Sequence, residues 1–227
     1  MRVLSWVPIV IVTVVHLVAL VADAAVVAAW SQVLLMPALA VVLLTLPRHD
    51  RGPAWPWAGG ALAASWVGDS LPRVVPEDAQ FLSMVGGFAV AQVLWIVAFT
   101  RVERGRAPMA WTLLLVVVAV ALLAVTMPEA GILAPAVLAY GMLLLAVAWF
   151  AADHGWVGGL GGALFILSDG LIALGAFRPD LVDWPERDLM VMATYVAAQA
   201  LFVAVVLFTR SPDHTLLRSP IHLRDAA

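Results

Sequence analysis

The chain has 227 residues, of which 64% are apolar and only 12% are charged, and its formal net charge is −3. A soluble domain is about half apolar and about a quarter charged, so the composition indicates an integral membrane protein and excludes a disordered chain, a fibrous chain and a nucleic-acid-binding domain. The sequence has no cysteine and no lysine, which excludes disulfides, thiolate catalysis and Schiff-base chemistry.

Eight apolar stretches are each long enough to cross a bilayer as a helix, which takes about 20 residues. In chain order they cover residues 4–23, 27–46, 55–72, 80–99, 109–127, 130–150, 157–177 and 189–209. We therefore expect one all-α transmembrane domain over residues 1–227, with a short cytoplasmic tail at 211–227. The first stretch follows Arg2 like a signal peptide, but its apolar run exceeds the about 7–15 residues of such a peptide, so we interpret it as a retained helix.

Loop arginines predict the orientation of the spans, because cytoplasmic loops carry an excess of basic residues. Nine arginines lie on the side of the two termini: Arg2, Arg48, Arg51, Arg101, Arg104, Arg106, Arg210, Arg218 and Arg224. Three lie on the other side: Arg73, Arg178 and Arg187. The pattern predicts a multi-pass protein of the plasma membrane with both termini in the cytoplasm.

The two halves of the chain, residues 1–106 and 107–210, resemble each other. Three paired motifs occur in the same order, around Pro37 and Pro135, Asp69 and Asp169, and Gln92 and Gln199, at offsets of 98, 100 and 107 residues. Because each half has four spans, the halves are predicted to run parallel about a pseudo-twofold axis along the membrane normal. The two aspartates would face each other across that axis.

Four ionisable side chains lie inside the predicted spans: His16, Asp23, Asp69 and Asp169. A charge at mid-membrane costs several kcal/mol, which makes such residues functional candidates. Asp169 is the strongest candidate, because apolar runs precede and follow it. Asp23 lies near a span end and is expected to be solvated. For Asp69, a position at the membrane interface is an alternative interpretation. For His16 we favour a structural hydrogen bond over catalysis.

Neutral polar residues accompany the aspartates: Gln32, Gln92, Tyr140, Tyr195 and Gln199. With a rise of 1.5 Å per residue, most reach a similar depth, so a polar layer is expected in the outer half of the bundle. Tyr195 shares a helix face with Gln199, and Ser65 shares one with Asp69, since each pair is four residues apart. Glutamines in spans often only tie helices together, and this structural role is favoured for Gln92 and Gln199.

The glycine-rich run at residues 158–162 predicts close helix packing, since it is not a phosphate-binding or dinucleotide pattern. The histidines and acidic residues lack metal-ligand spacing, so no metal and no cofactor is expected. Two carboxyl groups in a low-dielectric cavity act as an acid–base pair when one is protonated and the other ionised. Such a pair can hydrolyse a substrate or relay protons in a transporter, and the residues alone leave both open.

Three motifs resemble the YhhN-like family, the lysoplasmalogenases: Gly68-Asp69, the run from Gly161 to Asp169, and the run from Tyr195 to Gln199. The resemblance covers most of the chain, and the segment from Gly162 to Asp169 is its most specific part. It implies an eight-span hydrolase that cleaves the vinyl-ether bond of a lysoplasmalogen, or of a related ether lysophospholipid. The products would be a fatty aldehyde and a glycerophospho head group.

On this resemblance, Asp69 and Asp169 are the catalytic pair. Six residues would position substrate or water: His16, Gln32, Gln92, Ser168, Tyr195 and Gln199. The expected partners are a lysophospholipid and the bilayer, and no nucleic acid is expected.

Three positions depart from the family pattern. Gln32 stands where the family has lysine, and Gln92 and Trp95 stand where it has histidine and tyrosine. Two alternatives to the hydrolase therefore stay open. One is a proton-coupled transporter whose parallel halves rock around the aspartates, and the other is a lipid-binding membrane protein without turnover.

Overall fold

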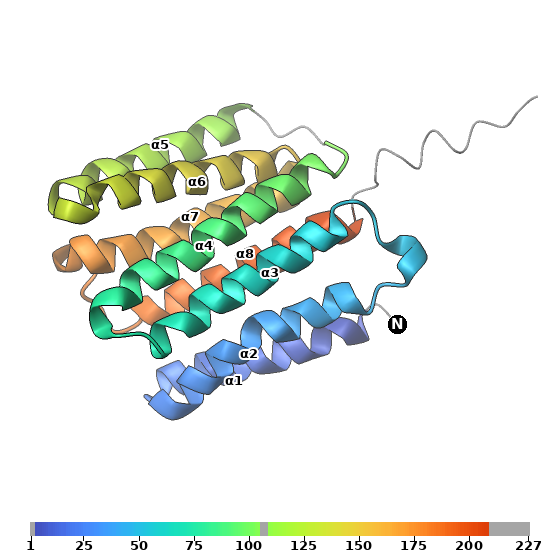
Figure 1. Cartoon of the computed structure of the whole chain (residues 1–227), viewed down its shortest axis with the longest axis horizontal. Coiled ribbons are helices and arrows are strands. Elements are labelled where there is room, and N and C mark those ends of the chain that lie inside the picture. The colour runs from blue at the N-terminus through green and yellow to red at the C-terminus, as the bar shows by residue number, and fades with distance from the viewer. Residues whose placement is uncertain (1–2, 105–108, 209–227) are drawn as a thin grey trace, which may run out of the picture.

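The computed structural model describes residues 3–104 and 109–208, and these form a helical bundle with no strand among them (Figure 1). Its helices are α1 (Val7–Val21), α2 (Ala25–Leu44), α3 (Trp55–Ser70), α4 (Glu77–Thr100), α5 (Met109–Thr126), α6 (Ala134–Ala152), α7 (Gly155–Phe177) and α8 (Arg187–Phe208). The predicted all-α fold and its eight helices are thus confirmed, while the number of membrane-spanning helices differs.

Seven of the eight helices are long and apolar enough to cross a membrane, and α3 is the exception. The sequence predicts a span over residues 55–72, but α3 has 16 residues and ends at Ser70. Pro72 lies two residues further on, and because it has no N–H to donate to the preceding turn, the chain continues as a single 3₁₀ turn at Leu71–Arg73. The multi-pass membrane architecture therefore rests on seven spanning helices, with α3 packed among them.

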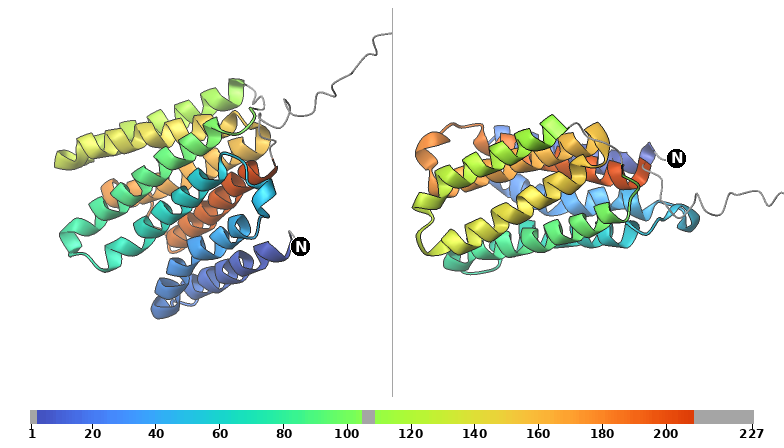
Figure 2. Two further views of the ribbon diagram at one scale, coloured as in Figure 1. Left: turned by 45° about the vertical axis from the view of Figure 1, so that its right-hand side comes forward. Right: turned by 90° about the horizontal axis from the view of Figure 1, so that it is seen from above.

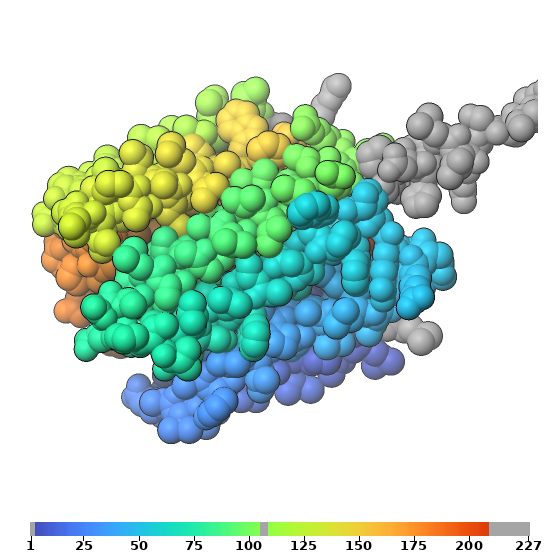
Figure 3. All heavy atoms as spheres, in the orientation of Figure 1, coloured from blue at the N-terminus to red at the C-terminus, as the bar shows by residue number. Residues whose placement is uncertain are grey.

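The helices lie side by side with α1 and α2 at one edge of the bundle and α5 and α6 at the other (Figures 1 and 2). Helices α3, α4, α7 and α8 lie between these pairs. Figure 3 shows the side chains of α2, α3, α4 and α6 in contact along one face. The central helices are therefore flanked by the two outer pairs, and Asp69 and Asp169 are buried between them.

Both described ends of the chain lie at one end of the bundle, where Leu4 and Phe208 line the same surface hollow. We call this the N-terminal end, and the opposite end, which carries the α1–α2, α3–α4, α5–α6 and α7–α8 connections, the far end. The described arginines divide as predicted: Arg48, Arg51, Arg101 and Arg104 at the N-terminal end, and Arg73, Arg178 and Arg187 at the far end. The cytoplasmic placement of the N-terminal end stays a prediction. The remaining arginines of that count, and the tail at 211–227, lie outside the described residues.

Glycines bring the central helices into close contact. A Cβ atom at Gly162 of α7 would lie 2.9 Å from the Cα atom of Ala148 on α6, and one at Gly87 of α4 would lie 2.6 Å from the Cα atom of Gly68 on α3. Real side chains do not tolerate such distances, so only glycine fits. The packing role predicted for the run 158–162 is confirmed.

An aromatic cluster fills the bundle on the N-terminal side of the two aspartates. Trp95, Phe99, Phe165 and Phe202 are all fully buried. Their ring centroids lie 5.2–5.6 Å apart, within the range of favourable aromatic pairs. The polar side chains around Asp69 and Asp169 lie on the other side of this cluster, toward the far end.

The close α6–α7 contact predicts a steric cost for any side chain at Gly162. We expect Gly162→Ala to lower the free energy of unfolding by about 1–3 kcal/mol, because the added methyl meets backbone atoms of α6. Gly86→Ala on α4 is the matched control, since its Cβ would have nothing within 4 Å. Thermal unfolding of the purified protein in detergent, followed by tryptophan fluorescence, measures both. Equal melting temperatures for the two variants would contradict this account of the packing.

Candidate active site

The first carboxyl centre is Asp69, in the last turn of α3, with 6% of its surface exposed. Its Oδ2 atom accepts a hydrogen bond from the Tyr195 hydroxyl at 2.8 Å, and its Oδ1 atom accepts one from the Gln32 amide at 3.3 Å. Arg73, one turn further on, donates to the Asp69 backbone carbonyl and, at 2.6 Å, to the side-chain oxygen of Gln32. Both carboxyl oxygens thus accept hydrogen bonds, an arrangement that suits an ionised carboxylate.

The second carboxyl centre is Asp169, in the middle of α7, with 7% of its surface exposed. Its Oδ2 atom accepts hydrogen bonds from the Tyr140 hydroxyl of α6 at 2.6 Å and from the Gln92 amide of α4 at 3.4 Å. Within the described part of the chain, no hydrogen-bond partner is found for Oδ1. The chain contains two tyrosines, and each of them binds one of the two aspartates.

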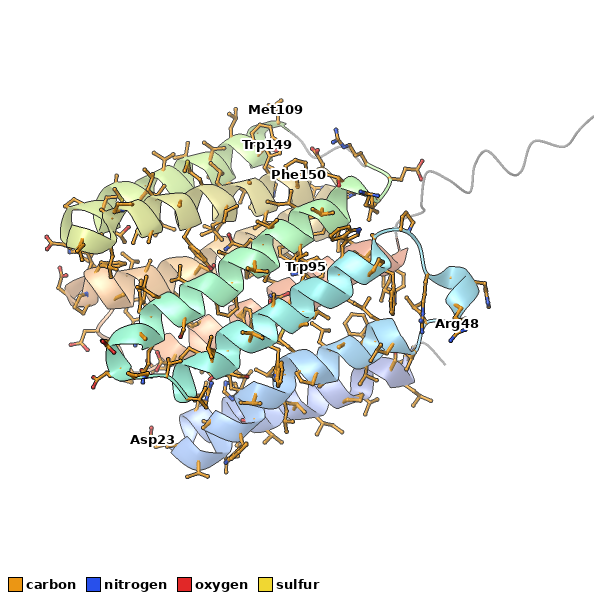
Figure 4. All side chains as sticks on the ribbon, viewed as in Figure 1. Asp23, Arg48, Trp95, Met109, Trp149 and Phe150 are labelled. Atoms are coloured by element: carbon orange, nitrogen blue, oxygen red, sulfur yellow. The ribbon has the colours of Figure 1, made fainter. Side chains whose placement is uncertain are left out.

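A chain of polar contacts lies beside the Tyr195–Asp69 pair. Gln199, one turn along α8 from Tyr195, donates to the Ser65 hydroxyl at 3.1 Å and accepts from the Trp95 indole at 3.0 Å. Figure 4 labels Trp95 on α4, in the middle of the bundle. The two pairs predicted to share helix faces therefore contact each other: Tyr195 of α8 bonds to Asp69 of α3, and one turn away Gln199 bonds to Ser65.

Contacts to the aspartates cross between the two halves of the chain. Gln92 on α4 reaches Asp169 on α7, and Tyr195 on α8 reaches Asp69 on α3. The two carboxyl groups also lie within electrostatic range of each other. This crossing is the pattern expected if the halves are related by a twofold axis, but the repeat itself stays a prediction.

An apolar cavity opens beside Asp169 between α4, α5, α6 and α7. The space in it that is open to a water-sized sphere is about 70 Å³, less than the about 300–1,000 Å³ typical of ligand pockets. Asp169 and Tyr140 supply its polar wall. We call it the chain cavity, and its larger apolar lining residues include Phe81, Met84, Phe88, Leu122, Leu144 and Ile172. It is a narrow apolar slot that ends at a carboxyl group, and a long hydrocarbon chain would have to widen it.

Two of the sequence-predicted site residues lie apart from the carboxyl groups. Ser168 donates to the backbone carbonyl of Val191 at 3.1 Å, so its contact ties α7 to α8. His16 Nδ1 lies 2.9 Å from the Ser31 hydroxyl oxygen, so a hydrogen bond between α1 and α2 is present, while the role of His16 stays a prediction. Asp23 is exposed in the turn between α1 and α2, as expected. The other predicted positions meet around Asp69 and Asp169: Gln32, Gln92, Tyr195 and Gln199.

The sequence interpretation missed two participants. Tyr140 was counted as a neutral polar group and not assigned to the site, although it is one of only two tyrosines and lies inside a span. Arg73 was counted only as a topological charge, yet it touches both Gln32 and the backbone of Asp69. A cation within one helical turn of a buried acid was the available signal for Arg73.

Comparisons with known proteins relate the chain to a described family. The sequence model of the YhhN family matches residues 27–206. Lysoplasmalogenase TMEM86B from Homo sapiens is 36% identical over 157 residues, which make up 67% of this chain and 63% of that relative. Lysoplasmalogenase TMEM86B from Sus scrofa is 34% identical over 174 residues, which make up 73% of this chain and 70% of that relative. The chain thus spans somewhat less than two thirds of the human relative's length, and no solved structure matches it.

The buried Trp95–Gln199 hydrogen bond predicts a measurable coupling between the two residues. Trp95→Phe leaves the Gln199 oxygen without its donor, so we expect a loss of about 1–3 kcal/mol in the free energy of unfolding. Adding Gln199→Leu should cost less in that background than in wild type, because the shared bond is already lost. Trp149→Phe, at an exposed position on α6 (Figure 4), is the control and should be near neutral. Strictly additive losses in thermal unfolding would refute the coupling.

Proposed function

The chain belongs to the YhhN family, and from this membership and the geometry of the site we propose that it is a membrane hydrolase that cleaves the vinyl-ether bond of a lysoplasmalogen. Hydrolysis of the substrate would give a fatty aldehyde and a glycerophospho compound. One observation carries the proposal: Asp69 and Asp169 are both buried, each is hydrogen-bonded to a tyrosine, and an apolar cavity ends at one of them. The relatives' name, lysoplasmalogenase, supports this choice of substrate.

In this proposal Asp169 is the acid. It lines the chain cavity, and its Oδ1 atom is not engaged by other described residues, so a proton there faces the bound alkenyl chain. Asp169 transfers that proton to the β-carbon of the vinyl ether, and the carbon–carbon double bond becomes an oxocarbenium ion at the ether carbon. Tyr140 and Gln92 hold Oδ2 in place and stabilise the carboxylate that the transfer leaves behind.

Asp69 is the base in the second step. Its two oxygens are oriented by Tyr195 and Gln32, and it removes a proton from the water that attacks the oxocarbenium carbon. The resulting hemiacetal collapses: its hydroxyl group gives its proton back to Asp169, the bond to the glycerol oxygen breaks, that oxygen takes the proton held by Asp69, and the aldehyde leaves. One water is consumed in all, the two carboxyl groups return to their starting states, and the scheme uses no cofactor.

The structure favours hydrolysis over transport at one point. A transporter that alternates its access would have to open a path past the aspartates to the N-terminal end. There the bundle is filled by the fully buried rings of Trp95, Phe99, Phe165 and Phe202. The chain cavity, in contrast, already places apolar side chains next to Asp169, so an apolar substrate would reach the acid without opening the aromatic cluster.

The three departures from the family pattern also fit an active site rather than an abandoned one. Gln32 contacts Asp69, Gln92 contacts Asp169, and Trp95 holds Gln199. All three side chains thus still support the polar layer. We place the enzyme as a multi-pass protein in the plasma membrane, with the loop arginines as support for its orientation.

Asp169→Asn tests the acid directly. The amide keeps the shape of the side chain but has no acidic proton, so we expect kcat to fall by a factor of about 10²–10⁴. The assay measures aldehyde released from a vinyl-ether lysophospholipid by purified protein in detergent. Asp78→Asn, an exposed Asp→Asn change in the first turn of α4, should retain wild-type activity. Full activity of Asp169→Asn would rule out this role for Asp169.

Tyr140→Phe and Tyr195→Phe test the two hydrogen bonds that orient the carboxyl groups. Each change removes one hydroxyl that bonds to an acid, worth about 1.5–3 kcal/mol, so kcat should fall about tenfold or more in each variant. Substrate affinity should change less, because neither hydroxyl is assigned a contact with the lipid. Measurement of kcat and KM separately checks this split. A rise in KM with unchanged kcat would show that the tyrosines bind substrate instead.

A further inference from the structure

A second, partly open cavity lies at the far end of the bundle between α1, α2, α7 and α8. The space in it that is open to a water-sized sphere is about 500 Å³. We call it the polar pocket and define it by five of its lining residues: His16, Gln32, Arg73, Arg187 and Asp188. Its position ties it to the carboxyl pair in two ways. Gln32 and Arg73 both contact Asp69, and Ile172 of α7 lines both this pocket and the chain cavity.

Two guanidinium groups line the polar pocket. Arg73 donates to the neutral Gln32 side chain and to a backbone carbonyl, and no acidic side chain among the described residues forms an ion pair with it. Arg187 pairs with Asp188 at 3.0 Å, and the Asp69 carboxyl group lies behind Gln32. Guanidinium groups are well suited to phosphate oxygens because they offer paired donors.

The start of α8 adds to the attraction for an anion. This helix of 22 residues begins at Arg187, in the wall of the pocket. The first N–H groups of a helix lack partners within it, and its dipole places partial positive charge at that end. A phosphate between Arg73 and Arg187 would therefore lie at the favourable end of α8.

His16 lines the same pocket and carries a hydrogen-bond acceptor that has no partner among the described residues. The Ser31 hydroxyl donates to the backbone carbonyl of Val27 at 2.6 Å, so the Ser31 oxygen accepts the hydrogen of His16 Nδ1. In the neutral ring, Nε2 then carries a lone pair. The His16 side chain is only 1% exposed, and Nε2 has no hydrogen-bond partner among the described residues. A buried polar atom without a partner is uncommon, and a hydroxyl group that reached Nε2 from the pocket would satisfy it.

We propose that the polar pocket binds the glycerophospho portion of a single-chain lipid, with the phosphate on Arg73 and Arg187 and the free glycerol hydroxyl donating to His16 Nε2. The inference rests on the proposed function, since the vinyl-ether bond then lies between this pocket and the chain cavity, beside Asp69 and Asp169. A second acyl chain would remove the hydroxyl hydrogen that Nε2 accepts. The pocket therefore selects lipids with one chain.

A binding assay that needs no turnover tests the phosphate contacts. The probes are an uncleavable alkyl-ether lysophospholipid and the alkylglycerol of the same chain length, titrated into purified protein in detergent and followed by tryptophan fluorescence. Wild type should bind the phospholipid at least about tenfold more tightly. Arg73→Gln should lose most of this preference and retain its affinity for the alkylglycerol, which also shows that the variant is folded. Arg178→Gln is the matched control, since Arg178 lies at the same end, outside the pocket, and pairs with Asp180.

A second probe tests the His16 contact. The 2-O-methyl derivative of the same lysophospholipid has no hydroxyl hydrogen, so wild type should bind it more weakly by a factor of about 3–10. His16→Phe should bind both lipids equally while still preferring phospholipid over alkylglycerol. Equal binding of the methylated and free lipids by wild type would overturn the assignment of His16.

Further outcomes separate a lipid head group from a free anion and this inference from the hydrolase. Inorganic phosphate at the concentration of the lipid should not displace it, and displacement would show a free-phosphate site instead. Equal wild-type affinity for the lysophospholipid and the alkylglycerol would overturn the phosphate site. The same loss of preference in Arg178→Gln as in Arg73→Gln would also overturn it. Aldehyde release is measured in parallel. A phosphate preference without aldehyde would support this pocket and refute the hydrolase, whereas aldehyde without the preference would do the reverse.

Discussion

The burial of two carboxyl groups in one apolar bundle is the constraint on which the rest of this structure depends. A buried charge or polar group is costly unless it has hydrogen-bond partners. The chain supplies these partners from four different helices: Gln32 from α2, Gln92 from α4, Tyr140 from α6 and Tyr195 from α8. Each donor fixes its helix relative to α3 or α7, which carry the acids. The polar contacts thus set the register of the bundle and the geometry of the site together.

The interior of the bundle differs between its N-terminal end and its far end. Toward the N-terminal end, the Gly162–Ala148 contact and the aromatic cluster around Trp95 and Phe202 close the interior. Toward the far end, the chain cavity and the polar pocket lie on either side of the carboxyl pair. A lysophospholipid has three parts in the same order: a hydrocarbon chain, a reactive ether bond, and a charged head. The division of the fold therefore corresponds to the division of the proposed substrate.

The sequence predicts much of this architecture for clear physical reasons. Hydrophobic length locates the helices, the cost of a charge in the bilayer singles out Asp69 and Asp169, and the four-residue spacing pairs Tyr195 with Gln199. It does not show which face of α6 turns inward, so the bond from Tyr140 to Asp169 is visible only in the structure. The reach of Arg73 back to Gln32 depends on the 3₁₀ turn after Ser70, which local pattern did not predict. Ser168 shows the converse: its neighbour Asp169 made it a candidate, but its hydroxyl bonds to α8 instead.

The central claim is that a carboxylic acid protonates the β-carbon of a vinyl ether and a carboxylate activates the attacking water. Turnover in D₂O, with mass spectrometry of the aldehyde, tests it most directly. The transferred hydrogen comes from an acid that exchanges with solvent, so the account predicts one deuterium on the carbon next to the aldehyde carbon in the first product formed. An aldehyde released without deuterium at that carbon would contradict the account, because the carbon–carbon double bond would then have been opened by another route.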